Sequence, residues 1–337
     1  MMNKRLKQGS TFLLAVALTF PLLTLPGAKA ASAINTGQKC SIEFDISGNS
    51  SELLSASIPV KLYKVASVDE SGNYTGIGAF SKLDLSSVSA DNLDAAAATW
   101  AERAAEAKKL LKDDTEPTTT TLTQGRGTAT GLDTGLYLVD TPKVITPNYT
   151  YTFTPYLVSL PTNNYYSGNG ASDDWIYDLT KEHNSAVGLK PKQHVRYGNL
   201  VINKELVDHN ATFGNNATFV FQIDITTLDK KTETRIEELT FNAAGSDSVT
   251  IEKIPAGSTV TVTEVYSGAS YKLTSENKVK ATIVANDEKE AGQAGETAVV
   301  SFTNEHDGRT NGGYGVKNNF KLNEYGQYDY TKPAEKN

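Results

Sequence analysis

Three polar residues in the second half of the chain stand among apolar residues in a way that implies burial. Lys204, Glu264 and Asn304 each fall within a short segment of alternating character, which is typical of a strand. Residues two apart in a strand share a face, so each polar side chain should point the same way as its apolar neighbours. Those neighbours are Leu200, Ile202 and Leu206, then Val260 and Val262, then Val300 and Phe302.

A lysine, a glutamate and an asparagine buried together make one particular reaction available. Each would be costly to bury alone, so we expect the three side chains to meet in the core. Desolvation favours the neutral amine of Lys204, which is a nucleophile, and a protonated carboxyl on Glu264. That carboxyl can hydrogen-bond the carboxamide of Asn304 and move protons as ammonia leaves. The predicted product is a Lys204–Asn304 isopeptide bond, with Glu264 as the catalytic residue.

The segments that carry these residues predict one β domain. A strand of large apolar residues runs from Thr218 to Ile225, and a turn at Pro255 to Gly257 precedes the Glu264 strand. Short alternating segments separated by turn residues are the pattern of an all-β sandwich. The expected strands are 200–206, 218–225, 248–251, 259–265 and 298–304.

The preceding part of the chain shows the same alternation with one interruption. Residues 91–112 are rich in Ala, Leu, Glu and Lys and contain no Gly or Pro, which predicts a helix. The fold class is therefore expected to be mainly β, with two tandem β-sandwich domains and one helix inserted in the first. We place the first domain at 31–192, the second at 196–306, and a tail or late strands at 307–337.

Residues 1–30 have the pattern of a secretory signal peptide. Lys4, Arg5 and Lys7 precede an apolar run from Thr11 to Leu25, and a small-residue site predicts cleavage after Ala30. The apolar run is short for a membrane span, so no transmembrane segment is expected in the mature chain. Removing the four positive charges of residues 1–30 lowers the net charge from −7 to −11. An acidic exported chain is a poor candidate for binding nucleic acid.

Cys40 is the only cysteine, so the chain cannot form an internal disulfide. Covalent reinforcement would need another chemistry, and no cofactor is indicated. A hydrolase that pairs Glu264 with a histidine is the enzyme alternative, but no predicted cleft supports it. No pair of histidines has the spacing of a known metal signature, so no metal site is expected. The histidines are His183, His194, His209 and His306.

The second domain resembles Cna B-type domains of pilins and collagen-adhesin stalks. Residues 199–204, 261–264 and 301–305 look like the first strand, the glutamate box and the last strand of that family, and 255–258 like its turn. The resemblance covers about residues 197–306 and implies an immunoglobulin-like fold. It also implies that Lys204 is cross-linked to Asn304 with Glu264 as the catalytic carboxylate.

The first domain resembles the N-terminal domain of Gram-positive pilins, through residues 61–65, 135–139, 155–161 and 175–179. In such pilins a sortase joins a lysine after the Trp-containing strand to the next subunit. Here that place holds Lys190 and Lys192, outside the usual Tyr-Pro-Lys-Asn motif, so either is a candidate and a solvated linker is the alternative. Lys64 and Asp140 each share a face with apolar residues, so a second cross-link that involves them is conceivable, although no convincing Asn partner is found.

These patterns predict a secreted cell-surface structural subunit of the pilin type, stiffened by its own isopeptide bond. The expected partners are other pilin subunits, joined by a sortase, and host surface ligands. The alternative is a surface adhesin that binds a host matrix protein or glycan through its first domain. Residues 328–337 contain no LPXTG-like sorting motif, so attachment to the wall through that end is not expected.

Overall fold

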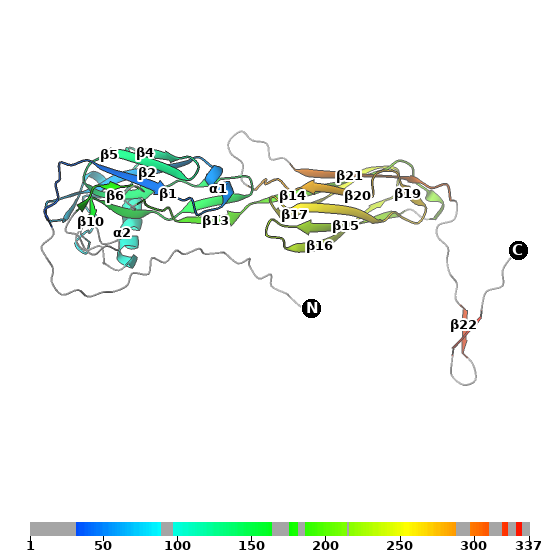
Figure 1. Ribbon diagram of the computed structural model, residues 1–337. Coiled ribbons are helices and arrows are strands. Elements are labelled where there is room, and N and C mark those ends of the chain that lie inside the picture. Colours follow the sequence, from blue (N-terminus) through cyan, green and yellow to red (C-terminus); the bar gives the residue numbers. More distant parts are fainter. Residues whose placement is uncertain are drawn as a thin grey trace. The chain divides into compact units, whose positions relative to one another are not determined.

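A computed structural model describes residues 32–88, 97–163, 175–180, 186–213, 216–287, 297–309, 319–322 and 328–331. The chain forms two compact units that divide between Val195 and Arg196. Figure 1 shows the first unit in blue to green and the second in green to orange. The expected signal peptide with its cleavage site at Ala30 lies outside the described residues. Most of the described residues with regular structure are in strands, so the mainly β prediction is confirmed.

In the second unit, the strands between Tyr197 and His306 form two four-stranded sheets around one core (Figure 1). The strand orders are β17-β14-β21-β19 and β16-β15-β18-β20. The elements are β14 (Tyr197–Leu206), η4 (Ala211–Phe213), β15 (Ala217–Thr226), β16 (Thr232–Phe241), β17 (Gly245–Pro255), β18 (Thr259–Tyr266), β19 (Tyr271–Leu273), β20 (Lys278–Thr282) and β21 (Ala298–His306).

Apolar residues at every second position of the strands explain this core. In β15 every second residue from Ala217 to Ile225 is buried, and the residues between them are partly exposed. Inward-facing residues of β14 and β21 meet those of β15 and β18 in a single apolar cluster. Each sheet therefore buries one face, as expected for two sheets packed face to face.

The first and last long strands of this unit are neighbours. β14 and β21 run parallel, and their register pairs Leu200 with Ala298 and Leu206 with Asn304. Parallel strands need a long connection, and here it contains every other strand of the two sheets. A bond between β14 and β21 would therefore enclose nearly the whole unit.

The first unit is built from several smaller sheets and helices. The sheets have the strand orders β12-β1-β5, β13-β8-β7, β10-β11 and β3-β2-β6-β9, with β4 also paired to β2. The elements are β1 (Cys40–Asp45), α1 (Ser51–Ser55), β2 (Ile58–Val68), β3 (Tyr74–Gly76), η1 (Gly78–Phe80), α2 (Ala97–Leu110), β4 (Thr118–Leu122), β5 (Arg126–Leu132), β6 (Gly135–Asp140), β7 (Val144–Ile145), β8 (Tyr149–Phe153), β9 (Tyr156–Leu160), β10 (Thr162–Asn163), β11 (Trp175–Ile176), β12 (Asp178–Leu179) and β13 (Pro191–Val195).

The central sheet of the first unit is covered on both faces. Every residue of β6 is buried. One face of β2 and β6 packs against β1 and β5, whereas the other packs against α2. The predicted helix at 91–112 is observed as α2 from Ala97 to Leu110, and residues 89–96 lie outside the described residues.

Beyond Arg309 the structure describes only β22 (Asn319–Leu322) and β23 (Tyr328–Thr331), which form an antiparallel hairpin. Of the two expectations for residues 307–337, a tail or late strands, this hairpin matches the second. Among the helices described, none is both long and apolar enough to cross a membrane.

Candidate functional site

The three predicted residues lie on three strands of the second unit. Lys204 is on β14 and Asn304 on β21, in the same sheet, whereas Glu264 is on β18 in the opposing sheet. The exposed fractions of the three residues are 1% for Lys204, 6% for Glu264 and 0% for Asn304. The alternation in the sequence predicts that these polar side chains point inward, and their burial agrees with that prediction.

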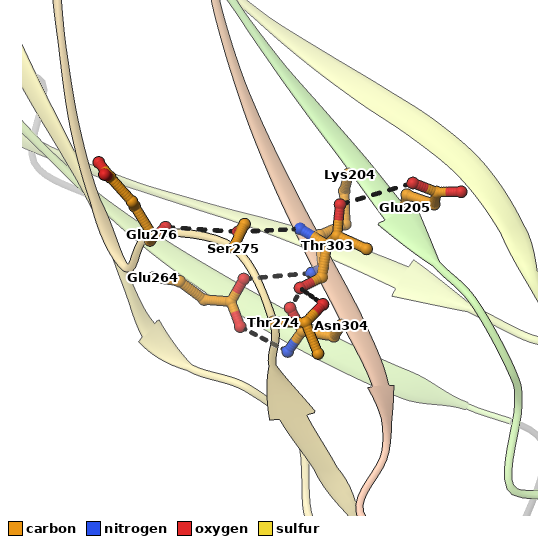
Figure 2. A network of polar contacts seen from close by, with 8 residues as sticks. All are labelled: Lys204, Glu205, Glu264, Thr274, Ser275, Glu276, Thr303 and Asn304. Carbon is orange, nitrogen blue, oxygen red and sulfur yellow. Dashed lines mark hydrogen bonds and ion pairs between the residues drawn. The ribbon is translucent and has the colours of Figure 1, made fainter.

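The three side chains contact one another in a closed triangle (Figure 2). Nζ of Lys204 donates a short hydrogen bond to Oδ1 of Asn304. Nδ2 of Asn304 donates to Oε1 of Glu264 at 2.7 Å. Oε2 of Glu264 lies 3.2 Å from Nζ of Lys204, as an ion-pair contact rather than a hydrogen bond of good geometry.

Apolar and aromatic groups surround this triangle. Nζ of Lys204 lies 4.4 Å from the centre of the Phe219 ring. The rings of Phe221 and Phe302 contact each other, with centres 5.2 Å apart, in the same core. A ring face attracts a cation, but these rings cannot replace the hydration that a charged amine loses on burial.

Burial lowers the pKa of Lys204 from its ordinary value of 10.5, and the nearby Glu264 carboxylate opposes this effect only in part. The neutral amine is the form that can attack a carbonyl carbon. The carboxamide of Asn304 is the group nearest to that amine, and the carboxyl of Glu264 contacts both nitrogen atoms. The arrangement thus holds a nucleophile, an acyl group and a proton carrier in contact.

The part of the chain that carries this site matches one family model. Residues 200–307 match the family described as a domain of unknown function (DUF5979). This segment is less than half of the chain, and it contains Lys204, Glu264 and Asn304. No curated protein matches the chain.

Several solved structures match with low identity. The minor pilin GBS52 of Streptococcus agalactiae is 15% identical, with 74% of this chain and 82% of that chain covered and a TM-score of 0.23. The TIE protein of Bacillus anthracis is 13% identical, with 58% and 30% covered and a TM-score of 0.28. The full-length major pilin SpaD of Corynebacterium diphtheriae is 12% identical, with 81% and 99% covered and a TM-score of 0.25.

The structure does not bring Lys64 and Asp140 together. Nζ of Lys64 lies 3.8 Å from Asp133, whereas Asp140 contacts Lys108 of helix α2. The reason is the double-sided burial of this sheet: Lys64 pairs with Tyr137, which faces β1 and β5, and Asp140 follows Leu138 on the face that α2 covers. The two side chains thus have different partners on opposite faces of the sheet, and this arrangement does not support a second cross-link between them.

The two candidate linkage lysines lie at the surface of the first unit. Lys190 is exposed, and its Nζ lies 5.5 Å from the centre of the Tyr156 ring. Lys192 is exposed on β13, opposite Thr152 of β8. The segment expected to be a linker thus continues a sheet of the first unit up to Val195.

The three histidines that the structure describes lie beside groups other than Glu264. His194 contacts Thr152 on the first unit, and His306 contacts the backbone of Arg309. His209 lies beside Tyr271, and His183 lies outside the described residues. In the part of the chain that the structure describes, no three His, Cys, Asp or Glu side chains are grouped to hold a metal ion.

Sequence reasoning missed a set of polar contacts next to Asn304. The segment after β19 hydrogen-bonds to Thr303 through Thr274 and Ser275 (Figure 2). No period or motif marks these residues, because hydroxyl residues are common in the turns of any β domain.

Proposed function

We propose that the second unit forms a spontaneous isopeptide bond between Lys204 and Asn304, with Glu264 as its catalytic residue. The observation that carries this proposal is the buried triangle of side chains, in which the amine contacts the carboxamide and the carboxyl contacts both nitrogens. Reactants held in contact at a fixed orientation can react with effective molarities of about 10⁵ M or more.

The proposed reaction conserves atoms and charge. A proton passes from Nζ of Lys204 to Glu264, which leaves a neutral amine beside a carboxylic acid. The lone pair of Nζ attacks Cγ of Asn304, and a new C–N bond forms. Glu264 takes a second proton from Nζ as it delivers its own to Nδ2, the Cγ–Nδ2 bond breaks, and ammonia leaves. The ammonia carries the remaining proton of Glu264 away as ammonium, so Glu264 ends as the carboxylate that it was at the start. Each chain reacts once and no substrate is turned over.

The bond would fix the first strand of the unit to the last. Lys204 and Asn304 are 100 residues apart in sequence, and β15 to β20 lie between them. A cross-link of this kind resists unfolding because it removes freedom from the unfolded chain, as a disulfide does. A chain with one buried cysteine has no disulfide for that role.

We further propose that the protein is a cell-surface structural subunit of the pilin type, which assembles with other pilin subunits. The signal-like residues 1–30, the two β units in tandem and the reinforcing chemistry support this assignment. A structural subunit needs a site that reacts once and then bears load, which is what the closed triangle offers. Immunogold labelling of the producing cells tests this role: we expect label along fibres, and scattered label without fibres would contradict it.

The intact mass of the mature chain tests the bond itself. The purified wild-type protein should weigh one ammonia less than its sequence requires, and a digest should contain the 204-to-304 linked peptide. A full-weight protein with a free Lys204 peptide would overturn the proposal.

A further inference from the structure

The position of Glu264 relative to Asn304 depends on a contact between the two sheets. Lys204 and Asn304 are held in register by the ladder between β14 and β21. Glu264 belongs to the other sheet, where its strand pairs with β15 and β20. Ladder bonds fix positions within a sheet, but they do not fix one sheet against the other. A catalytic contact of 2.7 Å across the sandwich therefore needs its own support.

The four residues from Thr274 to Asn277 connect the two sheets at this point. They follow β19, which pairs with β21 so that Leu273 lies opposite Asn304. They precede β20, which pairs with β18 so that Lys278 lies opposite Thr263. The segment thus leaves one sheet beside Asn304 and enters the other beside Glu264.

Hydrogen bonds hold both ends of this crossover segment. On the Asn304 side, the backbone N of Thr274 donates to the carbonyl of Thr303 at 2.9 Å, and the backbone N of Thr303 donates to Oγ of Ser275 at 3.1 Å (Figure 2). On the Glu264 side, the backbone N of Glu264 donates to the carbonyl of Asn277 at 3.1 Å. The crossover segment is therefore bonded to the backbone of Glu264 itself and to the backbone of Thr303, the residue before Asn304.

The hydroxyl of Ser275 extends the hydrogen-bond ladder between β19 and β21 at the place where the chain after β19 leaves that sheet. Thr303 directs both of its backbone groups toward β19 and the segment that follows it. Its carbonyl accepts from Thr274, but the chain has turned away by Ser275, so a side-chain hydroxyl takes the place of the backbone acceptor for its N–H. Without that hydroxyl the half-buried N–H of Thr303 would lose its partner beside the reacting carboxamide.

We propose that Ser275 is a positioning residue for isopeptide formation. It acts through the backbone of Thr303, which carries Asn304, and keeps the carboxamide within reach of Glu264. This inference rests on the proposed function, because it concerns the rate of the reaction between Lys204 and Asn304. Small misplacements of reacting groups can slow such reactions by about a hundredfold.

The test is the rate of cross-linking in newly made full-length chains. The chain is synthesised in a cell-free extract with a short pulse of labelled amino acid and is quenched in denaturant at intervals. The linked 204-to-304 peptide is then measured by mass spectrometry. Ser275→Ala should slow its appearance by about ten- to a hundredfold, and Ser275→Thr, which retains the hydroxyl, should restore the rate. Thr274→Val is the matched control, because the carbonyl of Thr303 keeps its bond to the backbone of Thr274.

Two further measurements separate positioning from general stability. In a Lys204→Ala background, which cannot react, adding Ser275→Ala should leave the unit folded with a similar thermal midpoint. The pH profile of the reaction should keep its shape, with a lower rate at every pH, because Ser275 carries no proton in the reaction. Ser275→Ala chains that cross-link at the wild-type rate, or a rate loss matched by equal unfolding, would overturn this inference. A wild-type chain with no linked peptide would instead overturn the proposed function.

Discussion

Asn304 lies opposite Leu206 in the parallel pair of β14 and β21, whereas Lys204 lies opposite Phe302. The two reacting residues are therefore diagonal neighbours on one face of the sheet, two positions apart along the strands. A lysine side chain is long enough to cover that step, and its amine reaches Oδ1 of Asn304 in the core. The diagonal also leaves room for Glu264 to enter from the opposing sheet between them.

Replacement of Glu264 should prevent the cross-link and leave the unit folded. Glu264→Gln keeps the size of the side chain and its acceptor for Asn304 but removes the group that carries protons. We expect its intact mass to equal the full sequence mass, in contrast to wild type. Glu205→Gln is the matched control, because Glu205 is next to Lys204 on β14 but has an exposed side chain, so it should leave the ammonia deficit intact. A deficit that persists in Glu264→Gln would contradict the catalytic role.

Loss of the cross-link should lower the free energy of unfolding of the second unit. The bond would close a loop of 100 residues, for which the chain-entropy relation gives about 4–5 kcal/mol. Glu264→Gln should therefore unfold at lower denaturant concentration than wild type and be cut faster by protease. Lys204→Ala should lose about 1–3 kcal/mol more, because Glu264 and Asn304 would then be buried with fewer partners. Denaturant melts of the three proteins check this order, and equal midpoints would refute it.

The rate of cross-linking should rise with pH, pass through a maximum and then fall. Burial lowers the pKa of Lys204, so the neutral amine appears at a lower pH than for an exposed lysine. Deprotonation activates the nucleophile. Glu264 must still hold the proton that it delivers to Nδ2, so the maximum should lie below pH 10.5. Pulse-labelled chains quenched at a series of pH values provide the measurement. A maximum at or above that pH would mean that burial does not activate this amine.

Joining between subunits should depend on Lys190 or Lys192. Both lysines are exposed at the end of the first unit, and Lys192 lies on an edge strand. When the protein is produced with its cognate sortase, the double variant Lys190→Ala/Lys192→Ala should lose the high-mass ladder on denaturing gels. Lys109→Ala, which removes an exposed lysine of α2, should keep it. A ladder that survives in the double variant would place the linkage elsewhere.

Mass measurement also checks the first unit. Since Lys64 and Asp140 have separate partners, Lys64→Ala should leave the wild-type ammonia deficit unchanged. A bond between Lys64 and Asp140 would release water, so a wild-type deficit of one ammonia plus one water, reduced to one ammonia in Lys64→Ala, would show that the first unit does react.

The alternation of polar and apolar residues in the second unit was sufficient by itself to identify the candidate site. Successive side chains of a strand point to opposite faces, so residues two apart share a face. Lys204, Glu264 and Asn304 each stand two residues from an apolar residue, and this spacing alone predicts that they face the core. The same rule located the five strands expected in this unit. It missed β16, β19 and β20, because β19 and β20 are short and β16 and β20 are largely exposed, so their residues carry little apolar alternation.

Only the tertiary structure decided which polar residues of the first unit meet. Lys64 and Asp140 both alternate with apolar residues, but β2 and β6 bury both faces, so the same pattern leads to opposite sides of the sheet. Helix α2 supplies Lys108 to Asp140, which no local pattern indicates. The diagonal between Lys204 and Asn304 and the support from Ser275 likewise depend on register and on a crossover between sheets. These are relations between distant segments, and the alternation within one strand carries no information about them.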